Sequence, residues 1–264
     1  MKHDAQNYSE FRPFFPKDLF TSFWSELSHA RPARIGDIAC GGGQSTLPMA
    51  EAGRALAPNP FEIFAYDSDP AMIERLKDLL PSSPSLPIQA QVASAEDLPL
   101  ADQSLDGIVC LSAYHWLDRK RANTEWLRVL KKKGVILVGE YQFPKSPRNR
   151  EINEWIRRQF NTLWKLEQQR PRGTLKELLI ELTGHPRVRR LSWDKTSTTL
   201  AFDPLQLSGL IQSQARFIAY ADSLKTDEAR ASELRRVQEN LEALFRGATE
   251  PFEFQFHWAL MTLT

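Results

Sequence analysis

Residues 34–46, RIGDIACGGGQST, decide the fold, because an apolar run ends there in three consecutive glycines. The run from Ile35 to Ala39 has the length of a buried strand, and a helical pattern begins at Gln44. A glycine-rich turn between a strand and a helix lets the backbone approach a ligand and directs the helix N-terminal amides towards it. The stretch therefore predicts a nucleotide-like ligand at the start of a βα unit.

Short apolar runs continue to alternate with helical patterns as far as about residue 143, which is typical of a parallel sheet built from βα units. The runs that predict strands are Ile35 to Ala39, Phe61 to Tyr66, Ile88 to Ala93, Leu105 to Ser112 and Val135 to Tyr141. Helical patterns between them predict helices over residues 44–53, 70–80 and 119–130.

The pattern changes after residue 143. Amphipathic spacing and helix-start signals predict helices at Glu151 to Lys165, Thr174 to Leu182 and Thr226 to Phe245. Residues 187–202 have the composition of an extended or hairpin segment, and the alternation that begins at Phe252 predicts a strand that completes the sheet.

These patterns predict one α/β domain over residues 1–264, with a doubly wound, mostly parallel seven-stranded sheet and an inserted, mainly helical cap. The expected parts are an N-terminal helical cover (1–34), a cofactor-binding half (35–143), a cap or substrate region with one sheet strand (144–250) and a closing strand (251–264).

Composition places the chain among ordinary folded proteins, with 42% hydrophobic and 25% charged residues. Lys and Arg number 34 and Asp and Glu 33, so the net charge of +1 disfavours a nucleic acid or a membrane surface as partner. The first residues contain no apolar signal region, and Cys40 and Cys110 cannot form a disulfide framework. We therefore expect a cytoplasmic protein. Four histidines show no metal-ligand spacing and are expected to be structural or exposed, so no metal site is expected: His3, His29, His185 and His257.

Positions around the glycines discriminate between nucleotide cofactors. Thr46 occupies the place where dinucleotide-binding loops have a small third residue, which disfavours NAD and FAD, and no Gly-Lys-Ser/Thr follows, which excludes a phosphate-loop NTPase. The carboxylate of Asp37 would repel a pyrophosphate but can accept hydrogen bonds from an ammonium group. Asp67 ends the second strand run, where it can accept both hydroxyls of a ribose. These residues together predict an adenosine that carries an amino-acid tail.

Three motifs, in this order, resemble those of the class I S-adenosylmethionine-dependent methyltransferases, which have a Rossmann-like fold. They are DIACGGG (37–43), YDSDPAM (66–72) and the segment SAEDLPL (94–100) with SLD (104–106). The resemblance implies S-adenosylmethionine as the cofactor. Two positions depart from the family pattern, because Ala39 replaces the first glycine and Ser94 stands where many members have an acid near the adenine. We expect the Ala95 backbone and the Glu96 side chain to replace that acid.

The segments YSEFRPFFP (8–16) and SAYHWLD (112–118) are similar to those of the branch that contains the trans-aconitate methyltransferases. The detailed similarity covers about residues 8–143, roughly half of the chain. It implies that Tyr8 and Arg12 cover the methionine end of the cofactor, the alternative being that they anchor an N-terminal helix. The implied cofactor contacts are Tyr8, Arg12, Asp37, Ala39, Gly41, Gly43, Asp67, Ser68, Met72, Ala95, Glu96 and Ser112.

Methyl transfer from a sulfonium depends mainly on positioning the acceptor, so no catalytic triad is expected. A carboxylate acceptor needs no general base, whereas a phenol or an amine usually does. His115 follows the fourth strand at the carboxyl edge of the sheet, which makes it the candidate base or substrate contact. The alternative is a hydrogen-bonded wall residue beside Trp116.

The charges divide unevenly along the chain. Residues 35–143 contain 10 Lys and Arg and 14 Asp and Glu, whereas residues 144–250 contain 19 and 14. A basic cap favours an anionic small molecule, because guanidinium groups hold carboxylates bidentately, although such arginines often only solvate helix faces. The expected substrate contacts are Tyr114, Trp116, Arg150, Arg157 and Arg216.

We therefore expect a methyltransferase that acts on a small molecule, at a carboxylate or hydroxyl oxygen. One alternative is methylation of RNA or protein, which the lack of a strongly basic stripe disfavours. The other is a cofactor-binding regulator without turnover, since this chemistry leaves no obligatory catalytic residue.

Overall fold

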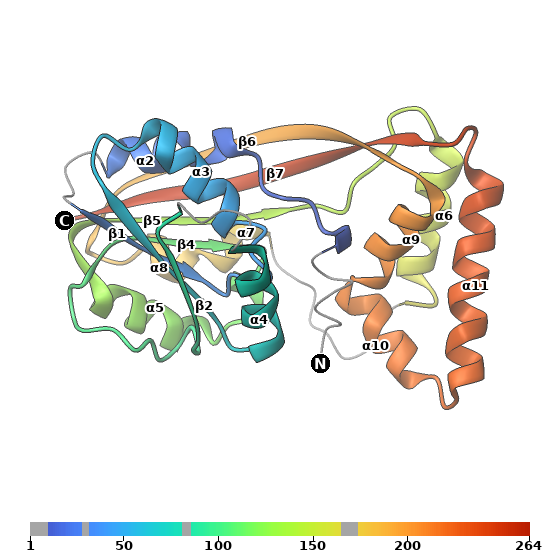
Figure 1. Ribbon diagram of the computed structural model, residues 1–264, viewed down its shortest axis with the longest axis horizontal. Coiled ribbons are helices and arrows are strands. Elements are labelled where there is room, and N and C mark those ends of the chain that lie inside the picture. Colours follow the sequence, from blue (N-terminus) through green and yellow to red (C-terminus); the bar gives the residue numbers. More distant parts are fainter. Residues whose placement is uncertain (1–9, 28–31, 81–85, 165–173) are drawn as a thin grey trace. The chain divides into compact units, whose positions relative to one another are not determined.

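A seven-stranded sheet runs through the computed structural model, which describes residues 10–27, 32–80, 86–164 and 174–264 (Figure 1). The strand order is β3-β2-β1-β4-β5-β7-β6. Strands β1 to β5 pair in parallel and β7 pairs antiparallel to β5, which confirms the predicted fold class. The strands are β1 (Ala33–Ile38), β2 (Phe61–Asp67), β3 (Ile88–Val92), β4 (Leu105–Leu111), β5 (Leu130–Tyr141), β6 (Val188–Phe202) and β7 (Glu250–Leu263).

The strand order reverses between β1 and β4. From β1 the chain adds β2 and β3 on one side and then returns to add β4 and β5 on the other. The connections that leave the carboxyl ends of β1 and β4 therefore diverge, and open α/β sheets bind ligands at such a point. In the register, Ile38 lies beside Tyr66 and Asp37 lies beside Val109, so these strand ends share one edge.

Helices α3 (Thr46–Leu56), α4 (Pro70–Leu79) and α5 (Arg119–Val129) connect these strands. Two of them begin with an acidic N-cap, because Asp69 accepts from the Ala71 amide and Asp118 accepts from the Arg121 amide. The short helix α2 (Thr21–Glu26) packs beside α3, and the 3₁₀ helices are η1 (Lys17–Phe20) and η3 (Tyr114–Trp116). Short apolar runs and first-turn signals thus place these elements close to where the sequence predicts them.

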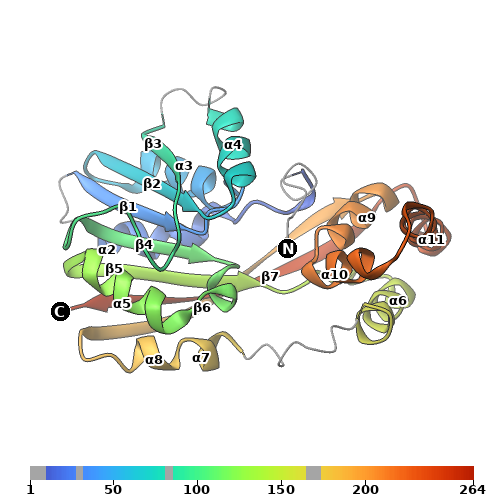
Figure 2. The same ribbon diagram turned by 90° about the horizontal axis from the view of Figure 1, so that it is seen from below.

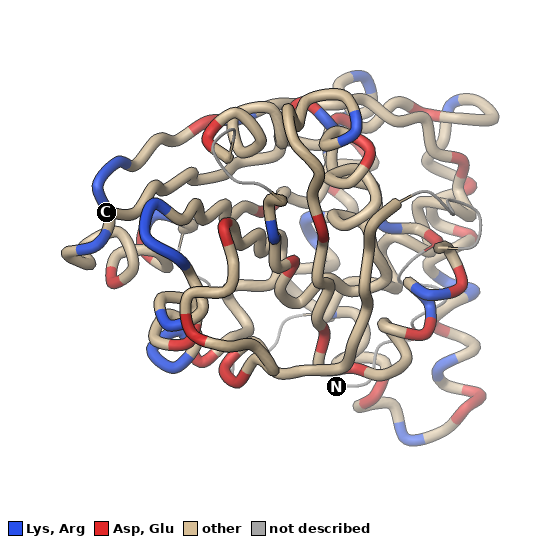
Figure 3. Tube along the Cα trace, turned by 60° about the vertical axis from the view of Figure 1, so that its left-hand side comes forward, with Lys and Arg blue, Asp and Glu red and all other residues tan. Residues whose placement is uncertain are grey.

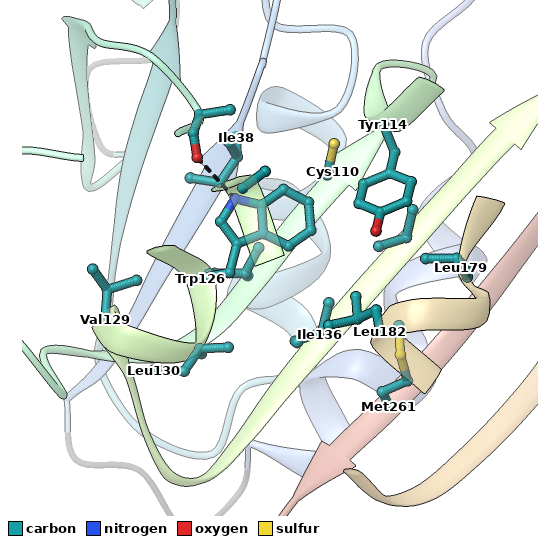
Figure 4. Packing of buried hydrophobic residues seen from close by; sticks show 14 of the residues in the cluster. Ile38, Cys110, Tyr114, Trp126, Val129, Leu130, Ile136, Leu179, Leu182 and Met261 are labelled. Atoms are coloured by element: carbon teal, nitrogen blue, oxygen red, sulfur yellow. Dashed lines mark hydrogen bonds between the residues drawn. The ribbon is translucent and has the colours of Figure 1, made fainter. Parts of the chain in front are cut away.

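A buried cluster joins the sheet to α5, α7 (Leu175–Leu178) and α8 (Ile180–Thr183), which Figure 2 shows in front of the strands. Trp126 of α5 lies at its centre, fully buried, and its indole nitrogen donates to the Ala95 carbonyl at 3.2 Å (Figure 4). The Tyr114 ring packs against Trp126 with 5.5 Å between ring centres. Leu179 and Leu182 belong to the same cluster.

The chain forms two compact units. The sheet unit consists of residues 13–141, 172–196 and 256–264, and the helical unit consists of residues 1–12, 142–171 and 197–255. Residues 172–196, which lie inside the expected cap of 144–250, thus belong to the sheet unit, because their leucines are buried in its core. The helical unit contains α6 (Arg150–Asn161), α9 (Pro204–Gln212), α10 (Ala215–Ser223) and α11 (Asp227–Leu244).

The helical unit has an aromatic core of its own. Trp164 is fully buried and meets Phe160 and Phe217 edge to face, with ring centres 5.1 and 5.2 Å apart. Its indole nitrogen lies 3.3 Å from a carboxylate oxygen of Glu233, to which it donates, and Arg236 holds the same carboxylate through two hydrogen bonds of 2.7 Å. Packing and a paired buried charge therefore both stabilise this unit. Among the described residues, no helix has the length and apolar character that a membrane span requires.

Gly53 provides a test of the packing between α2 and α3. A Cβ atom at this position would lie 2.6 Å from the Trp24 ring and 2.9 Å from the Phe61 ring. Gly53→Ala should therefore lower the free energy of unfolding by about 1–3 kcal/mol, although alanine is normally the better helix former. Urea titration followed by tryptophan fluorescence measures this change.

Gly247→Ala is the matched control, because its nearest neighbouring atom would be 3.9 Å from the added Cβ. We expect this variant to stay within about 0.5 kcal/mol of the wild type. Equal stability of the two variants would contradict the close packing of α3 against α2.

Candidate functional site

The loop after β1 carries three left-handed residues within five positions. Ala39 has φ of 56°, Gly41 has 56° and Gly43 has 97°. Glycine adopts these angles freely, whereas alanine adopts them at a cost of about 1–2 kcal/mol. Ala39 thus keeps the conformation that the glycine of the family motif would have. The backbone amide of Cys40 donates to the Tyr66 carbonyl at 3.0 Å, which fixes the loop to the end of β2.

Asp67 connects this loop to the turn between β2 and α4. One carboxylate oxygen accepts from the Gly41 amide at 2.9 Å and the other accepts from the Asp69 amide at 2.9 Å. A carboxylate offers about four lone pairs, so a carboxylate at this position is a chemically suitable acceptor for the hydroxyls of a ribose. At Gly43 a Cβ atom would lie 2.7 Å from Leu76, so glycine is also required for close packing of α4.

Asp37 lies beneath the loop and is fully buried. Its Oδ2 accepts from the hydroxyl of Ser45 at 2.8 Å and from the hydroxyl of Thr46 at 2.6 Å. Burial raises the pKa of Asp37 to about 7, although these two hydrogen bonds act in the opposite direction. Its Oδ1 is buried and has no hydrogen-bond partner. An ammonium group is the kind of donor that would satisfy this oxygen.

Ser45 and Thr46 bind the candidate site residue Asp37, a contact that the sequence analysis does not identify. Thr46 stands where a dinucleotide loop has a small residue, and its hydroxyl instead binds the Asp37 carboxylate. A hydroxyl side chain eight or nine positions after an acidic strand end is the only sequence signal for this contact. The strand, the loop and the first turn of α3 are thereby joined through one buried carboxylate.

The segment after β3 contains Glu96, whose role in place of the family's acid stays a prediction. The hydroxyl of Ser94 donates to the Glu96 carboxylate, which also accepts from the Asp118 amide at 3.0 Å. Glu96 is therefore held between this segment and the start of α5. Ala95 is buried, and its carbonyl accepts from Trp126.

The segment after β4 contains four of the predicted site residues. Ser112 has φ of 55°, its amide donates to the Gly139 carbonyl at 2.7 Å, and its buried hydroxyl has no partner. The His115 ring packs against Trp116, whose side chain is 53% exposed. Tyr114, by contrast, is a core residue: its hydroxyl donates to Asn123 at 2.8 Å, and burial raises its pKa to about 12. Trp116 is thus exposed and His115 partly exposed, and their contact with a substrate stays a prediction.

The remaining predicted cofactor contacts have different surroundings. Ser68 is exposed, Met72 is buried, and Tyr8 lies outside the described residues. Arg12 belongs to the helical unit, where its Nε donates to the hydroxyl of Ser213 at 2.9 Å and its Nη2 donates to the carbonyl of the same residue at 2.7 Å. The structure therefore places Arg12 against the end of α9.

The three predicted arginine clamps are all exposed residues of the helical unit. Arg150 forms an ion pair with Glu154 at 2.8 Å, and its side chain is 91% exposed. Arg216 donates to the Phe160 carbonyl, and Arg157 lies on the surface of α6. Asp37 and Asp67 belong to the other unit, the sheet unit, so the assignment of the three arginines to the substrate stays a prediction.

The excess of Lys and Arg over Asp and Glu that the sequence shows for residues 144–250 depends on where the cap begins and ends. The helical unit has 15 Lys and Arg and 14 Asp and Glu, and the sheet unit has 19 of each. The excess of residues 144–250 arises largely from residues 172–196, which belong to the sheet unit. Figure 3 shows positive and negative residues interspersed along the trace. Neither unit therefore has the excess of positive residues that would favour an anionic substrate.

The part of the chain that contains most of these residues is similar to known methyltransferases. Residues 36–138 match the family described as methyltransferase domain. The chain is 31% identical over 137 residues to an uncharacterized methyltransferase of Schizosaccharomyces pombe. This match covers 52% of this chain and only 50% of the length of that protein. The chain is 28% identical over 220 residues to an uncharacterized methyltransferase of Mycobacterium tuberculosis, which covers 83% of this chain and 78% of the other.

Solved structures share the architecture. A protein of Anaeromyxobacter dehalogenans, assigned as a type II methyltransferase, has a TM-score of 0.65 at 21% identity, with 96% of this chain and 97% of that chain covered. Phosphoethanolamine N-methyltransferase 2 of Haemonchus contortus, in complex with phosphomonomethylethanolamine and S-adenosylhomocysteine, has a TM-score of 0.52 at 13% identity. That match covers 98% of this chain and 57% of the other. At these identities the likeness concerns the fold.

The raised pKa of Asp37 predicts a pH dependence of stability. Between the ordinary value of 3.8 and about 7, the folded protein retains a proton that the unfolded chain releases. Below about pH 4, protonated Asp37 therefore makes its full contribution to the free energy of unfolding. As the pH rises to about 7, this contribution is lost, by no more than about 1.4 kcal/mol for each pH unit. In Asp37→Asn the contribution is absent.

Urea titrations between pH 4 and pH 8 test this expectation. The free energy of unfolding of the wild type, relative to that of Asp37→Asn, should decrease steadily as the pH rises to about 7 and then stay constant. Asp78→Asn, at an exposed position of α4, is the control and should run parallel to the wild type. A constant difference for Asp37→Asn would show that Asp37 is ionised throughout this range.

Proposed function

We propose that this chain, whose residues 36–138 match the methyltransferase domain family, is an S-adenosylmethionine-dependent methyltransferase that transfers the cofactor's methyl group to an oxygen atom of a small molecule. The observation that carries the assignment of the cofactor is the left-handed glycine loop, which is tied to Asp67 and follows Asp37, whose Oδ1 has no partner.

The residues at the strand ends fit S-adenosylmethionine. The buried Asp37 oxygen lacks a donor, and the ammonium group of the methionine moiety would provide one. Asp67 can accept ribose hydroxyls, and Glu96, held by Ser94 and the Asp118 amide, is the candidate contact for the adenine amino group. When bound, the cofactor supplies a methyl group on a positively charged sulfur, activated for displacement.

The chain's own contribution to this reaction is to hold the acceptor in line. Alignment at near-attack distance can supply most of the acceleration, so no covalent intermediate is required. We assign the surface of His115 and Trp116 to the acceptor, because both follow β4 at the edge where the strand order reverses. His115 is the candidate base or substrate contact, and Trp116 is an aromatic wall.

A small-molecule acceptor is supported by charge and by relatives. Both units are nearly neutral, whereas polyanion binding depends on a positive surface. The ubiquinone/menaquinone biosynthesis C-methyltransferase of Geotalea daltonii is 33% identical over 122 residues, covering 46% of this chain and 50% of that protein. For this chain we favour an oxygen acceptor because residues 8–16 and 112–118 resemble the trans-aconitate methyltransferases.

The role of Asp67 can be tested by calorimetry. Asp67→Ala should weaken binding of S-adenosylmethionine and S-adenosylhomocysteine by about 1–3 kcal/mol, because the ribose hydroxyls lose a charged acceptor and the Gly41 amide loses its partner. Asp78→Ala, on the exposed side of α4, is the matched control and should bind like the wild type.

Unchanged affinity of Asp67→Ala would reject the ribose assignment, and a wild type that binds neither compound would reject the proposed function. Labelled methyl transfer into small molecules, RNA or protein then separates the proposed acceptor class from its alternatives. A wild type that binds the cofactor but labels none of these would be a binding protein without turnover.

A further inference from the structure

Some of the buried polar atoms that have no partner lie at the level where β1, β4 and β5 end. Most of the buried polar atoms of a folded protein are paired, so each unpaired atom calls for an explanation, of which a bound ligand is one. Of the seven such atoms in the described part of the chain, three lie in this region: Asp37 Oδ1 near the end of β1, Ser112 Oγ directly after β4, and His257 Nε2 in the middle of β7, opposite the end of β5. The proposed cofactor accounts for Asp37. The other two lie on the opposite side of the point where the strand order reverses.

The register places Glu140 between these two residues. In the antiparallel pair of β5 and β7, Glu140 is directly opposite His257. In the parallel pair of β4 and β5, Leu111 lies beside Gly139, and the amide of Ser112 donates to the Gly139 carbonyl at 2.7 Å. Ser112, Glu140 and His257 therefore lie at one level on three adjacent strands.

Glu140 and His257 also share a face of the sheet. Residues directly opposite on antiparallel strands point to the same side, with Cβ atoms about 4.5–5.5 Å apart. Val138 and Ala259, two positions away on each strand, are buried in the cluster that contains Tyr114. Glu140 and His257 therefore lie next to this cluster, on the same face of the sheet as Val138 and Ala259. Tyr114, from the segment after β4, packs in the same cluster.

The strand order divides the edge between cofactor and acceptor. Asp67 and Glu96, which we assign to the adenosine, follow β2 and β3. The ends of β4 and β5 and the adjacent part of β7 lie on the other side of β1. The groups that remain for a methyl acceptor there are His115, Glu140 and His257. His115 lies on a short 3₁₀ helix beside an exposed tryptophan, whereas His257 is held within a strand, which orients its ring more firmly.

We propose that His257 is the general base for a hydroxyl acceptor and that Glu140 positions and stabilises it. In this step the acceptor oxygen forms a bond to the methyl carbon, and the electron pair of the broken carbon–sulfur bond stays on sulfur. The hydroxyl proton passes to Nε2 of His257, and the Glu140 carboxylate stabilises the imidazolium. The inference rests on the proposed function and narrows it.

The same geometry selects against a carboxylate acceptor. A carboxylate carries no proton for His257 to take, and the charge of Glu140 would repel it. An alcohol or a phenol carries the proton that the pair is arranged to remove. The substrate class that follows is a small hydroxyl compound, and the product is a methyl ether.

The test uses the full chain, tritiated S-adenosylmethionine and acceptors that differ in which oxygen is blocked. Methyl esters of hydroxybenzoates have a free hydroxyl, the corresponding methoxybenzoates have a free carboxylate, and a protein-free extract supplies further small molecules. Mild alkali hydrolyses methyl esters but leaves methyl ethers intact. We expect alkali-stable label in the hydroxyl compounds.

His257→Gln should slow this transfer about 10²- to 10⁴-fold, while its affinity for S-adenosylhomocysteine stays within about twofold of the wild type. His185→Gln is the matched control, because His185 lies before β6 and its ring nitrogen accepts from the Arg187 amide at 3.2 Å. It should transfer at the wild-type rate. Glu140→Gln should lower kcat with little change in KM, and Glu140→Asp should retain more of the rate.

Binding provides a readout that does not depend on turnover. In the complex with S-adenosylhomocysteine, His257→Gln should weaken binding of the best free-hydroxyl acceptor about tenfold and leave binding of its methyl ether unchanged. Alkali-labile label, equal loss for both ligands, or transfer by His257→Gln at the wild-type rate would overturn the assignment and leave the proposed function intact. Absence of cofactor binding, or of label in every acceptor, would overturn both.

Discussion

The carboxylate of Asp67 is the interaction on which the cofactor edge depends. It accepts from the Gly41 amide in one loop and from the Asp69 amide in the next, so a single side chain sets the distance between the ends of β1 and β2. The carboxylate thereby provides the Gly41 amide, within the left-handed turn, with an acceptor. Asp37, just before the same loop, joins it to the first turn of α3 through two hydroxyls. Hydrogen bonds within the protein thus fix the polar groups of this edge.

Local patterns predicted the sheet half of the chain well, because its elements are defined by short-range signals. Apolar runs predict β1 to β5, and helical patterns predict α4 and α5, which the structure begins with the acidic caps Asp69 and Asp118. Strand β5 begins at Leu130 rather than Val135, because Leu130 pairs with Leu105 across the sheet, which no local pattern shows. Helix α9 was missed although its capping box, Asp203 with Gln206, was present in the sequence.

The site was predicted only as far as its residues are neighbours along the chain. The glycine loop and Asp67 follow from motifs, and the structure gives them the geometry that those motifs imply. Tyr114 is adjacent to His115 in the sequence, yet its ring is in the core, since a 3₁₀ turn points successive side chains in different directions. The sequence analysis treats His257 as structural or exposed, because it lies opposite Glu140 only through an antiparallel pairing between residues 117 positions apart.

The position of β7 has a consequence for how the chain folds during synthesis. β7 is made last, yet it lies between β5 and β6 in the sheet, so β6 has no place in the sheet until β7 arrives. The helical unit likewise requires residues up to 255. Until β7 has been synthesised, only β1 to β5 can pair, and β5 presents an open strand edge. The residues of β7 therefore complete both compact units.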